Sequence, residues 1–322
     1  METIKVVRSF VDGKAFAELI AAEYDFGGPV TCKLFSKMVR TQDNDHYLVT
    51  ATNGDKFVAR LYQVGTRLQR QESDYLYELD WLNFLEKEGL PVSYPIARKD
   101  GRFLGSILAP EGMRYYALFS LAEGTAMDIN DEEQLYIFGR EMARIHRLSN
   151  KYERKYDRRV LDLEFLVDKP VQRIKRYWDE DEGHREELEL LLISAQEAKD
   201  DLMALINNDQ YTADGWGPIG GDFHSSSVFF DEKNMPTFFN FDWCGTGWRA
   251  YDIAVFLHNS DLIHQRDPEL AEAFFAGYYS ERPLSENEHE AIAPFLTIRR
   301  IWLTGWFMMN DGLAGHSFIA PL

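Results

Sequence analysis

The residues best suited to chemistry lie in one polar stretch, 220–227, which contains Asp222 and His224. A short apolar run follows at 228–230, and a turn-prone segment separates it from a second run at 237–242, so a β-hairpin is expected. An acid and a histidine in such a loop, with a second acid on the next strand, are typical of metal-assisted phosphoryl transfer. One carboxylate accepts the proton of the attacking hydroxyl, and oxygen ligands on the neighbouring strand hold Mg²⁺ against the nucleotide phosphates.

Three segments in order carry a family resemblance: Gly221-Asp222-Phe223-His224, then Phe239-Asn240-Phe241-Asp242, then Gly245–Ala254 with its Ala-Tyr-Asp-Ile-Ala ending. Their order and spacing resemble aminoglycoside phosphotransferases, choline kinases and homoserine kinases. The resemblance implies a protein-kinase-like fold, and transfer of the γ-phosphoryl group of ATP or GTP to a hydroxyl of a small, amino-bearing molecule. It also implies that Asp222 and His224 are the catalytic residues and that Mg²⁺ takes part.

Two positions depart from the family pattern. Where the family has a metal-binding Asn and a metal-binding Asp, this chain has Ser227 and Asn240. Both keep an oxygen but are neutral, whereas a Mg²⁺ site normally uses at least one carboxylate. Asp242, two residues along and on the same face of the predicted strand, offers a substitute ligand beside them. The alternative is a catalytically impaired pseudokinase that binds a nucleotide, a metabolite or a protein.

The first 120 residues are expected to form a small sheet with one helix. Four β-prone runs are recognisable, at 47–50, 57–62, 101–108 and 114–120. Asn53-Gly54 lies between the first two runs and is typical of a tight hairpin, because both residues accept a positive φ. Apolar periodicity predicts a helix over 72–88, which Gly89 ends.

By the resemblance, this first region also binds the nucleotide. Arg60 lies mid-strand, where kinases place a cation that reaches the phosphates, and Glu78 on the following helix is positioned to pair with it. An ordinary ion pair is the alternative for these two residues. Phe119 and Ser120 fall where the connection between lobes contacts adenine, and a phosphate-covering loop is expected near 35–46.

From residue 121 the pattern becomes helical. Helices are predicted over 131–148 and 182–206, and a further one opens at a capping box, 285–288, and breaks or kinks at Pro294. Asn130 is expected to cap the first of them, and Asp252 to cap a helix over 253–259. The predicted fold is therefore a bilobal, kinase-like α+β protein. Its small lobe spans 1–120, and its helical lobe spans 121–322 and contains loop 220–227 and strand 237–242.

Acidic residues outnumber basic ones by 53 to 35, which gives a formal net charge of −18. Such a surface repels nucleic acid and anionic lipid and attracts cations, so we expect a cationic acceptor and no nucleic-acid or membrane partner. The alternative is that the acid only keeps the protein soluble. No apolar run approaches the ~20 residues of a membrane span. Two cysteines exclude a disulfide framework, so a cytoplasmic protein is expected.

Overall fold

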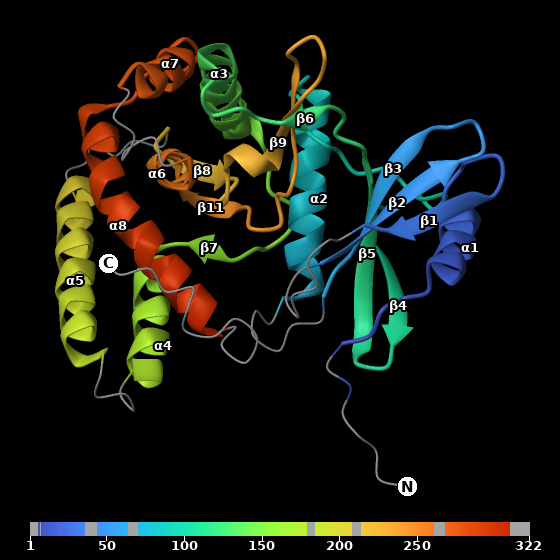
Figure 1. Cartoon of the computed structure of the whole chain (residues 1–322), viewed down its shortest axis with the longest axis horizontal. Coiled ribbons are helices and arrows are strands. Elements are labelled where there is room, and N and C mark those ends of the chain that lie inside the picture. The colour runs from blue at the N-terminus through green and yellow to red at the C-terminus, as the bar shows by residue number, and fades with distance from the viewer. Residues whose placement is uncertain are drawn as a thin grey trace, which may run out of the picture. The chain divides into compact units, whose positions relative to one another are not determined.

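The computed structural model describes residues 6, 8–35, 44–63, 70–178, 184–207, 214–260 and 268–309. Two compact units make up the chain (Figure 1). The first unit comprises Met1–Glu86 and Val92–Ala122, and the second comprises Lys87–Pro91 and Glu123–Leu322. Most of the expected phosphate-covering loop, at 36–43, lies outside the described residues.

The first unit is built on one antiparallel sheet with the order β1-β2-β3-β5-β4. Its strands are β1 (Val30–Leu34), β2 (Asp45–Ala51), β3 (Lys56–Leu61), β4 (Gly105–Ala109) and β5 (Gly112–Ser120). The predicted helix is confirmed as α2 (Glu72–Lys87). A further helix, α1 (Gly13–Glu23), was not predicted, although the Asp12 carboxylate caps it by accepting the Ala15 N–H at 2.9 Å.

The second unit is mainly helical and carries two small sheets. Its helices are α3 (Glu132–Leu148), α4 (Lys169–Trp178), α5 (Arg185–Asn207), α6 (Arg249–Asn259), α7 (Pro268–Tyr279) and α8 (Glu286–Met309). One sheet has the order β10-β9-β6, from β6 (Thr125–Ala126), β9 (Val228–Phe230) and β10 (Pro236–Phe238). The other has the order β7-β11-β8, from β7 (Val160–Leu161), β8 (Trp216–Ile219) and β11 (Gly245–Trp248).

The ends of these helices confirm one predicted cap and correct another. The capping box is present, because the Ser285 hydroxyl accepts the Glu288 N–H at 3.2 Å and the Glu288 carboxylate accepts the Ser285 N–H at 3.1 Å. At α3 the cap is Asp131 rather than Asn130, since the helix begins at Glu132 and the cap must directly precede it. The helix α8 runs through Pro294, so it does not break there, and the alternative of a kink at Pro294 stays a prediction.

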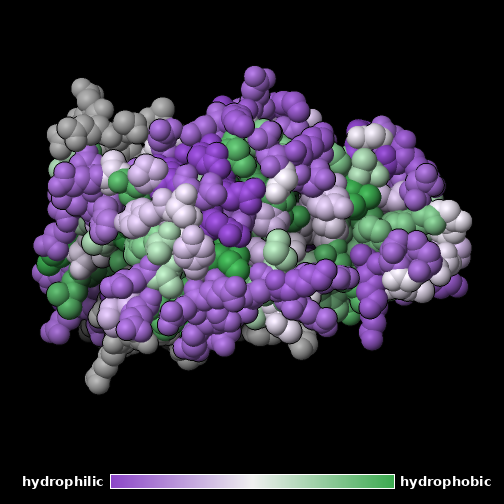
Figure 2. Space-filling view, turned by 90° about the horizontal axis from the view of Figure 1, so that it is seen from above, coloured by the Kyte–Doolittle hydropathy of each residue, from purple (hydrophilic) through white to green (hydrophobic). Residues whose placement is uncertain are grey.

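Figure 2 shows one face on which hydrophilic residues predominate and apolar residues occur in small groups. In the part of the chain that the structure describes, every helix is too short or too polar to cross a bilayer.

Candidate active site

The polar loop 220–227, which is predicted to carry the chemistry, is held in place by a side chain of α6 (Arg249–Asn259). Asp252 lies in the first turn of that helix and is fully buried. Its two carboxylate oxygens accept the backbone N–H groups of Gly220 and Gly221, each at 2.7 Å. The predicted role of Asp252 as a helix cap is therefore wrong, because Trp248 occupies the cap position and the acid fixes the loop instead.

A glycine is required at the turn of this loop. Gly221 has a φ of +72°, in the left-handed region, and a Cβ added there would lie 2.5 Å from the Trp243 carbonyl oxygen. A residue with a Cβ is rarely tolerated at such a φ, and it is rarely tolerated at so short a distance from a backbone oxygen. The loop can therefore pack directly on the backbone that follows the β9–β10 hairpin, and Asp222 comes next in the chain.

Behind Asp252 runs a chain of buried hydrogen bonds. The Arg282 guanidinium can only donate, and its Nη1 donates to the Tyr278 hydroxyl at 3.0 Å. That hydroxyl has one proton, which it gives to His146 Nδ1 at 2.9 Å. A neutral His146 then carries its own proton on Nε2, 3.0 Å from Asp252 Oδ2. We infer the order of donation along this relay, Arg282–Tyr278–His146–Asp252, from a neutral His146 with its proton on Nε2.

The pKa of His146 agrees with a neutral ring, whereas the pKa of Asp252 is shifted upward by burial. Burial, followed by the positive charges of Arg249 and Arg282, lowers the pKa of His146 well below its usual value, so the ring is neutral. Burial raises the pKa of Asp252 to about 7, although the two glycine N–H bonds favour the ionised form.

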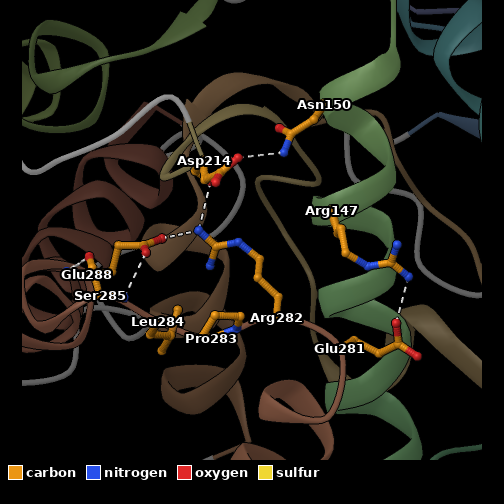
Figure 3. Close-up of a pocket in the computed structure, with 9 residues that line it drawn as sticks. All are labelled: Arg147, Asn150, Asp214, Glu281, Arg282, Pro283, Leu284, Ser285 and Glu288. Carbon is orange, nitrogen blue, oxygen red and sulfur yellow. Dashed lines mark hydrogen bonds and ion pairs between the residues drawn. The ribbon is translucent and has the colours of Figure 1, made fainter.

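At its far end the relay reaches a cavity of about 370 Å³ (Figure 3). Arg282 lies in the cavity wall, where it also donates to the Asp214 carbonyl at 2.8 Å and pairs with Glu288. Arg147 and Glu281 form another pair there, 2.7 Å apart. The cavity contains none of the residues predicted for chemistry, and these charged groups are paired with one another. We therefore assign it no part in the reaction.

Asp222 lies between two cationic or potentially cationic side chains. Its Oδ1 pairs with Arg299 Nη2 from α8, and its Oδ2 lies 3.6 Å from His224 Nε2. The Asp222 side chain is 15% exposed, so it is accessible to a small group. Burial opposes its ionisation, but the charge of Arg299 and the proximity of His224 outweigh that effect and hold its pKa below the usual value.

His224 is braced by the serines that follow it. The Ser226 hydroxyl lies 2.7 Å from His224 Nδ1, and the Ser227 hydroxyl lies 3.1 Å from Nε2. Ser227 is only 1% exposed. Its hydroxyl contacts the His224 ring, and the role of metal ligand suggested by its position in the sequence stays a prediction.

The strand predicted over 237–242 ends earlier in the structure than expected. The strand β10 ends at Phe238, and Asn240 has a φ of +66°, so the predicted strand over 237–242 is wrong in its second half. The argument that Asp242 shares a strand face with Asn240 fails with it. Asn and Asp are the side chains best tolerated in this left-handed conformation.

The loop and this segment nevertheless meet. The Ser227 carbonyl accepts the N–H of Phe239, one residue before Asn240, at 2.9 Å. The rings of Phe223 and Phe241 pack edge to face with centroids 5.4 Å apart. Residues on either side of Asp222 and Asn240 are thus in direct contact within the second unit.

The donor set left for a metal is small but chemically suitable. Asn240 supplies an amide oxygen and Asp242 a carboxylate, and both side chains are partly exposed. Among the described residues, His, Cys, Asp and Glu side chains form no group of three that could hold a metal by itself. Mg²⁺ is commonly bound by one or two carboxylates together with substrate phosphates and water. These two residues fit an ion that arrives with a nucleotide.

In the first unit, three of the four predicted nucleotide-binding residues lie together. Arg60 Nη1 pairs with Glu78 Oε1 at 2.5 Å, and the two side chains are 7% and 0% exposed. The Arg60 guanidinium lies over the ring of Phe119, 4.7 Å from its centroid. Ser120 is bonded to the neighbouring segment, where its hydroxyl accepts the Tyr94 N–H at 3.1 Å.

Sequence reasoning missed Arg299, the α8 residue that forms an ion pair with Asp222. A signal for it was present. Phe295, four residues before it, and Trp302, three residues after it, are both buried. An arginine at helical spacing between two buried aromatic residues lies on the core face, where an unpaired charge is costly and a partner is to be expected.

The chain is similar to known proteins over most of its length. The sequence profile of the Phosphotransferase enzyme family (APH) matches residues 38–295. An uncharacterised protein of Synechocystis sp. is 31% identical over 290 residues, which cover 89% of this chain and 76% of that protein.

Two solved structures share the fold. A microcompartment-associated aminopropanol kinase has a TM-score of 0.71 at 23% identity, over 94% of this chain and 89% of that chain. The amicoumacin kinase hAmiN, in complex with AMP-PNP, Ca²⁺ and Ami, has a TM-score of 0.70 at 19% identity, over 93% and 86%. The predicted kinase-like α+β fold is confirmed, and the alternative of a non-catalytic module gains no support from these kinases. With the family profile covering most of its length, the chain belongs to the phosphotransferase enzyme family.

Proposed function

We propose that the protein transfers the γ-phosphoryl group of ATP to a hydroxyl of a small, amino-bearing molecule. The observation that carries the proposal is the carboxylate of Asp222. It is partly exposed, ionised by its neighbours, and held by a loop whose backbone is bonded to Asp252. A pre-positioned carboxylate beside a nucleotide is what phosphoryl transfer to an alcohol requires.

In the proposed reaction, Asp222 orients the acceptor hydroxyl and accepts its proton on Oδ2. The hydroxyl oxygen forms the new bond to the γ-phosphorus, the bond from that phosphorus to the bridging oxygen breaks, and ADP departs with the electron pair. His224, 3.6 Å from Oδ2 and braced by Ser226, keeps the carboxylate turned toward the acceptor.

Asn240 and Asp242 are proposed to hold a divalent cation, which would neutralise phosphate charge when bound with the nucleotide. Arg60, steadied by Glu78 in the first unit, is proposed to contact the phosphates, with Phe119 and Ser120 near the base. The AMP-PNP and Ca²⁺ in the related amicoumacin kinase structure support a nucleotide and a divalent ion here.

An amino-bearing acceptor is supported by two observations. The formal net charge of −18 favours the approach of cations. One of the two fold neighbours reported above is an aminopropanol kinase. Both point to a small amino alcohol rather than to an anionic sugar.

The test is phosphoryl transfer from ATP to a panel of acceptors: 1-amino-2-propanol, ethanolamine, choline and homoserine, with glycerol as the uncharged control. We expect one amine to be phosphorylated, and Asp222→Asn to lower kcat at least about 10²-fold because the proton acceptor is lost. Asp231→Asn, in the exposed β9–β10 turn, is the matched control and should leave the rate unchanged. If no acceptor is phosphorylated, or if D222N and D231N behave alike, the proposal is wrong.

A further inference from the structure

Arg299 of α8 is a buried cation in contact with the carboxylate proposed for catalysis. Its Nη2 pairs with Asp222 Oδ1, and its side chain is 3% exposed. The guanidinium also lies over the ring of Trp302, 4.9 Å from the centroid. Trp302 in turn packs edge-on against Trp243, the residue whose carbonyl abuts Gly221 of the loop. Packing therefore fixes both partners of the ion pair.

The Tyr251 hydroxyl of α6 faces the same guanidinium. Burial raises the pKa of Tyr251 to about 12, and both Arg299 and Asp222 influence it. Because Arg299 contacts the proposed proton acceptor directly, it is placed to act on the reaction as well as on folding.

We propose that Arg299 is a positioning residue for phosphoryl transfer, an inference that rests on the proposed function. By holding Oδ1 of Asp222, it stops rotation of the carboxylate and leaves Oδ2 as the oxygen that meets the acceptor hydroxyl. One oxygen is thus dedicated to alignment and the other to the proton. Arg299 also places a fixed positive charge directly against the Asp222 carboxylate.

Electrostatics supports the geometry. The groups that face Asp222 are Arg299 from α8, His224 from its own loop, and Tyr251 and Asp252 from α6. Burial raises the pKa of Asp222, and the positive charge of Arg299 is the largest influence that lowers it. Removing that charge should raise the pKa of Asp222, so that the carboxylate is protonated at a higher pH than in the wild type.

The first test compares Arg299→Gln with Arg300→Gln, a control on the next residue of the same helix, which is partly exposed. With the best acceptor of the panel, R299Q should lower kcat about 10²-fold with little change in KM, because alignment is lost and binding is not. The acid limb of its kcat/KM profile should move to higher pH, which a merely structural role would not cause. R299K keeps the charge and should leave that limb near its wild-type position.

A second test does not depend on activity. The free energy of unfolding is measured for Asp222→Asn, Arg299→Gln and the double variant. A double-mutant cycle should show that the losses are not additive, because the two side chains contact each other. Additive losses, or an R299Q enzyme whose rate and pH profile match those of R300Q, would overturn the role of Arg299. If the wild type itself phosphorylates none of the acceptors, the proposed function is wrong, and the role of Arg299, which depends on it, is wrong too.

Discussion

Substitution of Tyr278 by Phe removes one oxygen from the middle of the buried relay. The ring stays, so packing against Phe274 is retained. His146 Nδ1 then loses the hydroxyl 2.9 Å away, and Arg282 Nη1 loses the one 3.0 Å away. His146 is 0% exposed, so its nitrogen cannot turn to water instead. Because a buried polar group without a partner costs about 1–3 kcal/mol, we expect the free energy of unfolding to fall by about 3 kcal/mol.

The assay is urea-induced unfolding followed by tryptophan fluorescence, which reports mainly on the second unit because only Trp81 lies in the first. The matched control is Tyr279→Phe, the next residue, which is 44% exposed and should change stability by less than about 0.5 kcal/mol. NMR of the His146 ring nitrogens checks the tautomer, with the proton expected on Nε2. A Y278F variant as stable as Y279F, or a wild-type proton on Nδ1, would refute the reasoning.

Three further predictions concern pH, the first unit and the metal. The folded chain keeps a proton on Asp252 up to about pH 7 against a usual pKa of 3.8, so it binds more protons than the unfolded chain between those values. The contribution of Asp252 to the free energy of unfolding should thus fall as pH rises through that window. Asp252→Asn should abolish this dependence of the free energy of unfolding on pH, as measured by denaturation curves at a series of pH values. Glu78→Gln breaks a buried ion pair and should destabilise the first unit by about 3 kcal/mol, measured by hydrogen exchange in α2; exchange unchanged from the wild type would contradict this. Asn240→Asp adds a carboxylate at a position whose φ of +66° suits Asp, so nucleotide binding should need less Mg²⁺, whereas Asp242→Asn should need more. Equal Mg²⁺ requirements in both variants and the wild type would count against the proposed ligands.

Much of the secondary structure could be predicted from the sequence because the patterns that indicate it are local. The Asn-Gly hairpin between β2 and β3, the periodicity of α2 and the capping box of α8 each depend on residues within a few positions of one another. The strand over 237–242 was predicted too long. The strand β10 stops at Phe238, and the chain turns at Asn240 into the left-handed region.

The family and the candidate residues could be inferred from the sequence, because the order and spacing of short motifs from Gly221 to Ala254 can be recognised without any knowledge of contacts. The contacts of those residues could be seen only in the folded chain. The structure shows Asp252 bonded to loop 220–227 rather than capping a helix, and Ser227 in contact with His224. It also brings Arg299, 77 residues further along the chain, onto Asp222. Spacing in a sequence cannot reveal such a partner, because the ion pair forms only when α8 packs against α6 and the loop.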